Sequence, residues 1–147
     1  MAQNKRTDPF GAYNFRVEIG GIIRVGFSEV SGLQVETETE EVREGGVNNY
    51  VHKLPKRTKQ SNITLKNGLT DSDSIWKWYK DVIAGIIERK TGCIILIDNQ
   101  GNRVMQWDFI EAYPVKWTGP ELRAGSNNIA FESLEIVHNG LSMQKLM

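Results

Sequence analysis

The chain has 147 residues, with 18 basic and 18 acidic side chains, so its formal net charge is zero. Balanced charge argues against nucleic acid as the main ligand, because phosphate binding needs a basic excess. It also removes the electrostatic repulsion that keeps copies of one protein apart. The single cysteine, Cys93, excludes an intrachain disulfide and a cysteine-cluster metal site, and its place before the apolar run 94–97 predicts a buried structural thiol.

The length suits one domain with a core of its own. Residues 1–9 are polar and predict a flexible N-terminal arm, which leaves 10–147 as a single domain. The N-terminus carries basic residues without a following apolar segment, and no apolar run approaches the roughly 18–20 residues that cross a bilayer. We therefore expect synthesis and assembly in the cytoplasm, with no signal peptide and no membrane insertion of the subunit.

The first part of the chain has the period-two hydrophobic alternation of strands. Residues 13–19 and 23–27 predict a hairpin, and a three-residue loop at 20–22 would place apolar side chains opposite one another. Residues 33–42 predict a long extended segment. Ile63 and Leu65 mark a further strand after the polar stretch 55–62.

The only predicted helix begins around residues 70–74, where Asp71 and Asp73 suit the positive end of a helix dipole. One side of the helix carries a predicted apolar stripe of Ile75, Tyr79, Val82, Ile83 and Ile86. Trp76 and Ile87 flank this stripe. Arg89 and Lys90 would occupy the last turn, and Gly92 would provide the left-handed cap. Trp76 and Trp78 diverge by about 200° on a helix, so at least one belongs to the core.

Strands are also predicted at 94–98 and 103–110, joined by a turn at 99–102, and at 113–117 and 129–137. In the last strand the apolar parity changes between Phe131 and Leu134, which predicts a bulge or cover on both faces. Many strands, one helix and 14 glycines predict a mainly β fold. We expect a small β-barrel or sandwich flanked by one α-helix, with a long extended hairpin loop.

Residue patterns that support catalysis are missing from the sequence. His52 and His138 are not at metal-ligand spacing with carboxylates or the cysteine, and neither pair of adjacent glycines forms a nucleotide-binding loop. Glu36, Glu38 and Glu40 lie two apart and would form a row along one strand face. We predict no enzyme, no cofactor and no metal.

The segment 33–62 has an unusual charge distribution. Its first arm, residues 36–44, has a net charge of −4, and its second arm, residues 52–60, has a net charge of +4, with a glycine- and asparagine-rich turn between them. One interpretation is a surface β-hairpin whose arms pair with each other. The other is a projecting element whose charges meet complementary patches on another copy. The candidate contact residues are Glu36, Glu38, Glu40, Glu41, Glu44, Gly45, Gly46, Asn48, Asn49, His52, Lys53, Lys56, Arg57 and Lys59.

This segment also resembles a known family. The run GLQVETETEEVREGGVNNYVHKLPKRTKQSNITLKNGLTDSDSIWKWY (32–79), the opening DPFGAYNFRVEI and the closing NIAFESLEIVHNGL are similar to the tail tube proteins of contractile phages and contractile injection systems, which are related to the type VI secretion tube protein. The likeness spans residues 8–141. It implies hexameric rings that stack into a hollow tube inside a contractile sheath, with sheath, baseplate, spike and tube-terminating proteins as partners.

By the same resemblance, Glu36 to Lys59 would reach a neighbouring ring. The alternative within this fold is a ring-shaped carrier that holds effector cargo in its lumen. A third hypothesis, a monomeric barrel that binds a small ligand or a nucleic-acid strand, needs an apolar cavity or a basic groove with exposed aromatic residues. The balanced charge and the inward-alternating aromatic residues disfavour it.

Overall fold

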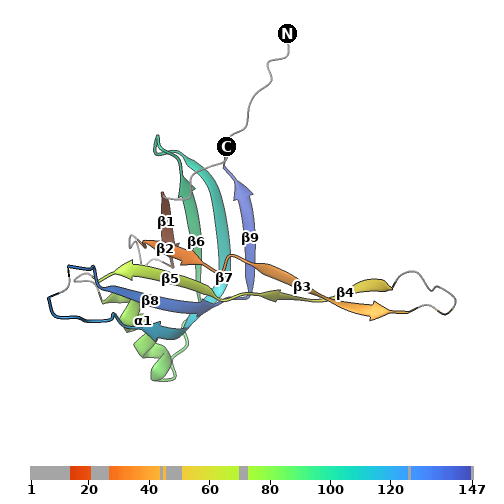
Figure 1. Cartoon of the computed structure of the whole chain (residues 1–147), viewed down its shortest axis with the longest axis horizontal. Coiled ribbons are helices and arrows are strands. Elements are labelled where there is room, and N and C mark those ends of the chain that lie inside the picture. The colour runs from red at the N-terminus through yellow and green to blue at the C-terminus, as the bar shows by residue number, and fades with distance from the viewer. Residues whose placement is uncertain are drawn as a thin grey trace, which may run out of the picture.

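A computed structural model describes residues 14–20, 27–43, 45, 51–69, 73–125 and 127–146 of the chain. These residues form nine strands and one helix (Figure 1). In chain order they are β1 (Phe15–Ile19), β2 (Glu29–Ser31), β3 (Val35–Val42), β4 (His52–Gln60), β5 (Ile63–Gly68), α1 (Ser74–Ile83), β6 (Lys90–Ile97), β7 (Arg103–Thr118), β8 (Phe131–Val137) and β9 (Gly140–Lys145).

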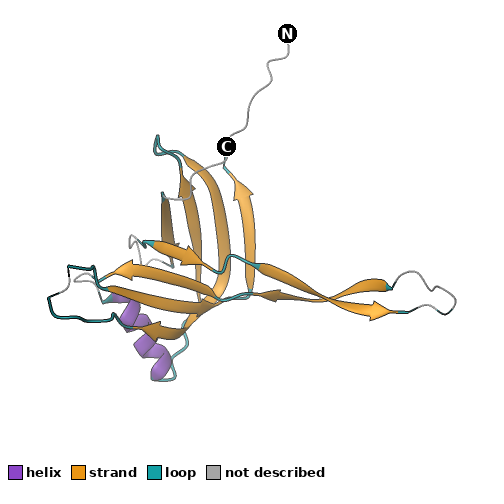
Figure 2. Ribbon diagram, viewed as in Figure 1, coloured by secondary structure: helices purple, strands orange, loops and turns teal. Residues whose placement is uncertain are grey.

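Seven strands form one antiparallel sheet in the order β1-β6-β7-β8-β5-β2, with β9 paired to β7, and β3 and β4 form a separate two-stranded sheet (Figure 2). The mainly β fold with a single flanking helix is confirmed. Within the described ranges β1 and β2 do not pair with each other, so the large sheet is open and not a closed barrel.

β7 joins the two halves of the large sheet. Its first part pairs with β6 and β9, and its last part pairs with β8. The chain bends at Glu111, which has a positive φ of 52° and accepts a hydrogen bond from the Asn139 side chain. The two strands predicted at 103–110 and 113–117 are therefore one bent strand that both layers share.

The core lies between these two layers, because alternate side chains of each layer point inward. Leu65 of β5 lies opposite Leu134 of β8, and Ile63 lies opposite Ile136, and all four are fully buried. Phe109 of β7 is also fully buried. The period-two pattern of the sequence thus places the core correctly in β5 and β8.

The bulge predicted for the last strand lies instead in the neighbouring strand, β7. β8 begins at Phe131, so Ile129 lies before the strand and is exposed. Pairing between β5 and β8 is continuous, whereas the register between β7 and β8 shifts between Pro114 and Lys116. Buried Glu132 continues the inward row of β8, and Trp117 Nε1 donates to its Oε2 at 3.1 Å.

The helix ends earlier than predicted. Gly85, with φ +85°, stops it: Gly85 N–H donates to the carbonyl of Val82 and Ile86 N–H donates to that of Asp81, the paired hydrogen bonds of a Schellman motif. Arg89 therefore follows the helix, and Lys90 and Gly92 belong to β6.

This early end also changes the buried stripe. Ile75 and Trp78 are the buried residues of α1, while Ile83, Ile86 and Ile87 are exposed. No helix in the described ranges is long and apolar enough to span a membrane.

The predicted hairpin of residues 13–19 and 23–27 falls largely outside the described residues, as do the arm 1–9 and Asp71. What is described is β1, which pairs antiparallel with β6, and Phe27, which is buried and lies outside any strand. Asp73 precedes α1 and its carboxylate lies 3.5 Å from Lys77 Nζ, without a side-chain capping hydrogen bond.

Candidate functional site

β3 and β4 form a two-stranded antiparallel ribbon, here called the β3–β4 ribbon, which projects away from the large sheet (Figure 1). Eight residues of β3 correspond to a reach of about 26 Å at the usual rise of a strand. Most of its side chains are exposed on both faces. An isolated two-stranded ribbon is only marginally stable in water, so this one is a natural element to be covered by another molecule.

The acidic and basic arms pair with each other along the ribbon. Glu36 lies opposite Lys59, and Glu41 lies opposite Lys53. Lys59 Nζ also lies 2.5 Å from Glu38 Oε1, and this hydrogen bond and the charge of Glu38 raise the pKa of Lys59. The interpretation of the segment as a β-hairpin with paired arms is therefore confirmed. Contacts of the same residues with another copy are compatible with this pairing, because the side chains remain exposed.

A bulge interrupts the ribbon at its middle. Thr37 pairs with Thr58 but Thr39 pairs with Pro55, so two residues of β4, Lys56 and Arg57, lie opposite the single residue Glu38 of β3. The extra residue in β4 increases the local twist. Proline, which has no N–H to donate, is tolerated beside a bulge because the hydrogen bonds between the two strands are interrupted there. The carboxylate of Glu38 makes its ion pair with Lys59, which follows the bulge in β4.

The distal part of the ribbon also carries apolar side chains, which the charge analysis did not identify. Leu54 lies opposite Glu40, and Val42 lies opposite His52, so all four share one face. Leu54 and Val42 are exposed, and we call this pair the distal apolar spot. Its sequence signal was the isolated apolar residue between basic ones in HKLPKR.

The turn of the ribbon is described only in part. Glu44, Gly46, Asn48 and Asn49 lie outside the described residues. Gly45 is described and exposed, and a Cβ added there would meet no atom within 4 Å.

The root of the ribbon is held by close backbone contacts. Gly32, between β2 and β3, has φ +90°, and a Cβ there would lie 2.0 Å from the carbonyl oxygen of Asn62, where the chain returns from β4. Ser61 N–H donates to the carbonyl of Gln34 at 3.2 Å, and His138 Nε2 lies 2.9 Å from the carbonyl oxygen of Ser61. These contacts fix the direction in which the ribbon leaves the sheet.

The described residues contain no group of three or more His, Cys, Asp or Glu side chains that could hold a metal ion. Cys93 is half-buried, and burial, then the charges of Glu18 and Asp108, raises the pKa of its thiol. The thiol is thus a poor nucleophile at neutral pH, and the ribbon is the feature of the fold with the clearest functional character.

Comparison with known proteins identifies the family of the chain. The family model described as T4-like virus tail tube protein gp19 matches residues 11–142. No curated protein matches the sequence significantly.

Several solved structures are similar over nearly the whole chain. A chain of the extracellular contractile injection system described as the PVC sheath-tube complex in the extended state is 29% identical, with 94% of this chain and 93% of that chain covered and a TM-score of 0.85. A chain of the anti-feeding prophage cap, the AFP tube terminating cap, is 27% identical, with coverages of 98% and 96% and a TM-score of 0.89. Hcp1 from Flavobacterium johnsoniae, at 21% identity, coverages of 88% and 93% and a TM-score of 0.56, shares the fold.

Proposed function

The chain belongs to the T4-like virus tail tube protein family and is a tail tube protein of a contractile injection system, and from this premise we propose that its copies close into hexameric rings which stack into a hollow tube. In this proposal the β3–β4 ribbon reaches the adjacent ring and sets the register of the stack. The role is structural and requires no cofactor.

The observation that carries the proposal is an exposed ribbon that has one acidic and one basic arm and is not covered by the rest of the described chain. Individual exposed ion pairs contribute only about 0–1 kcal/mol. A ring presents the same contact once per subunit, and the affinity of several linked contacts is far higher than that of one contact alone. The separate acidic and basic arms also favour a partner surface with matching patches, because like charges meet when the wrong surfaces approach each other.

The open sheet supports lateral association. Among the described residues β1, β2 and β9 each pair with a neighbour on one side only. Strand edges with free backbone groups are ready sites for pairing with another chain. Side-by-side association of copies would satisfy these edges, as ring formation requires.

The partners follow from the similar structures. Their descriptions name a sheath-tube complex, a tube-terminating cap and a sheath/tube terminator. We infer that this chain meets sheath subunits along the tube, a terminating protein at one end and baseplate and spike proteins at the other, within a phage-tail-like particle. The carrier alternative has less support, because the likeness to Hcp1 extends to the fold alone, and co-purified cargo inside isolated rings would distinguish it.

The test of the proposal is a charge reversal on the basic arm. The variant Lys53→Glu/Lys56→Glu/Arg57→Glu should still fold, because these side chains are exposed, and it should form few or no stacked tubes. Electron microscopy of concentrated protein measures stacking, and thermal unfolding followed by circular dichroism measures folding.

A matched control reverses the same amount of charge elsewhere, in Lys77→Glu/Lys80→Glu/Arg89→Glu, at exposed positions in and just after α1, and should stack like the wild type. Stacking of the ribbon variant at the wild-type level would refute the role of the ribbon. If the wild-type protein forms neither rings nor tubes, alone and with baseplate components, the proposed function itself is wrong.

A further inference from the structure

The connection between β7 and β8 lies at the end of the molecule opposite to the β3–β4 ribbon, along the longest axis of the subunit (Figure 1). It carries the two most exposed large apolar side chains of the described residues, Leu122 at 78% and Ile129 at 70% exposure. Both line one surface groove of about 490 Å³ together with Arg123, Phe131 and neighbouring residues. We call it the end groove.

The end groove is supported by the sheet. Leu69 N–H donates to the carbonyl of Ala130 at 2.9 Å and so extends the pairing of β5 with β8 beyond Gly68. A Cβ at Gly68 would lie 3.6 Å from Ile129 Cγ2, so the missing side chain leaves Ile129 uncovered on that side. The position of Ile129 is therefore fixed by strand pairing.

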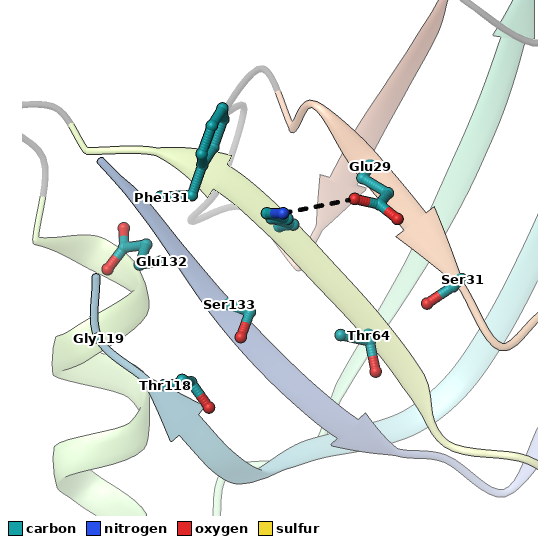
Figure 3. A pocket seen from close by; sticks show the side chains of 9 residues that line it. Glu29, Ser31, Thr64, Thr118, Gly119, Phe131, Glu132 and Ser133 are labelled. Carbon is teal, nitrogen blue, oxygen red and sulfur yellow. Dashed lines mark ion pairs between the residues drawn. The ribbon is translucent and has the colours of Figure 1, made fainter. Parts of the chain in front are cut away.

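A charged residue holds the aromatic wall of the groove in place. Lys66 Nζ lies 5.0 Å from the centre of the Phe131 ring and 3.8 Å from Glu29 Oε2. Figure 3 shows Phe131 and this ion pair in the adjoining pocket, which shares Lys66 and Phe131 with the end groove. A cation above a ring face is favourable by about 0.5–1 kcal/mol at an exposed site. The Phe131 ring is thus oriented without being buried.

The rim of the groove is charged. Arg123 Nη2 lies 2.7 Å from Glu121 Oε1, and both side chains are largely exposed. An apolar centre with a polar, charged rim is the usual composition of a protein–protein contact. Two large apolar side chains left in water at one end of a neutral subunit are best explained by a partner that covers them.

The β3–β4 ribbon has matching chemistry. Its distal apolar spot, Leu54 and Val42, shares a face with the carboxylate of Glu40. Apolar side chains would meet Leu122 and Ile129, and Glu40 would approach the guanidinium of Arg123. Because the ribbon reaches about 26 Å, this spot lies far from the large sheet of its own subunit.

We propose that the end groove receives the distal part of the β3–β4 ribbon from a copy in the adjacent ring. This inference rests on the proposed function and names the surface that completes the contact between rings. Donor and acceptor occupy opposite ends of one subunit, so the contact is head-to-tail and repeats without closing, as a tube of indefinite length requires.

The experiment uses cysteine pairs in a Cys93→Ser background. Leu54→Cys with Ile129→Cys, assembled into tubes and treated with a short bismaleimide, should give a ladder of covalent multimers on a denaturing gel. The matched control, Leu54→Cys with Ile83→Cys, replaces an equally exposed isoleucine at 64% exposure and should remain monomeric on the gel. A ladder from the control pair, or tubes of the first pair that yield no ladder, would overturn the inference.

A second variant covers the case in which the cysteine pair does not assemble. Leu122→Glu/Ile129→Glu should form rings that fail to stack, with at least a tenfold decrease in the fraction of protein that sediments as tubes. Ile83→Glu/Ile86→Glu is its control and should stack normally. Tubes of wild-type abundance from the first variant would overturn the inference and leave the proposed function intact, whereas the absence of tubes from the wild type would refute the proposed function.

Discussion

Replacing Gly32 by alanine tests whether backbone contact at the ribbon root stabilises the fold. Gly32 has φ +90°, and an added Cβ would lie 2.0 Å from the Asn62 carbonyl oxygen. Strained left-handed backbone costs about 1–3 kcal/mol for a residue other than glycine. Overpacking against atoms that must move costs about a further 1–3 kcal/mol. We expect a total loss of about 2–6 kcal/mol, a large share of the roughly 5–15 kcal/mol typical of a domain.

A matched variant separates the free-energy cost of backbone strain from the cost of steric overlap. Gly101 has nearly the same φ, +84°, but a Cβ there would meet no atom within 4 Å. Gly101→Ala therefore measures the backbone strain alone, about 1–3 kcal/mol. Urea unfolding of the dilute monomer, followed by tryptophan fluorescence, gives both free energies. Equal losses for the two variants would refute the idea that contact between Gly32 and Asn62 fixes the root of the ribbon.

Two further predictions concern the body of the subunit. Trp78→Ala should decrease the free energy of unfolding by about 3–5 kcal/mol, because Trp78 is buried. Trp76→Ala removes a partly exposed ring and should decrease it by about 1 kcal/mol. Similar urea midpoints for the two variants would contradict the assigned helix faces. Because burial, then Glu18 and Asp108, raises the pKa of Cys93, the folded thiol stays protonated where an unfolded one ionises, so stability decreases as pH rises through that range. Iodoacetamide should accordingly alkylate Cys93 faster in urea than in buffer, and equal rates would show the thiol to be unperturbed.

Much of the fold could be predicted because its signals are local. Alternation in β5 and in the first part of β7 identifies strands with one buried face, the apolar run 94–97 identifies β6, and opposite charge on the two arms identifies β3 and β4 as partners. The predicted helix end was wrong because the helix stops at a glycine inside the predicted apolar stripe, which runs to Ile86. Gly85, not Gly92, takes the left-handed position, and the choice leaves Ile83 and Ile86 exposed, a result that a periodicity analysis cannot reach.

Other features depend on contacts distant in the sequence. β9 has only two large apolar residues, Leu141 and Met143, too few for a clear strand pattern, and its pairing with β7, from Met105↔Lys145 to Ile110↔Gly140, defines it as a strand. The charges of the ribbon could be read from the sequence, whereas its distal apolar spot required the register of β3 with β4. The end groove required the meeting of the β7–β8 connection with β5.

The ribbon also explains how a neutral chain can associate specifically. Because Glu36 lies opposite Lys59 and Glu41 lies opposite Lys53, much of the charge is compensated within one subunit, and long-range attraction between copies is weak. Specificity then depends on short-range alignment, in which a misplaced copy loses its complementary charge contacts and withdraws apolar side chains from their partner surface. Such contacts are individually weak and strong only when a ring engages all of them together. Single subunits would therefore stay soluble at low concentration, while a ring already fixed on a template recruits further rings.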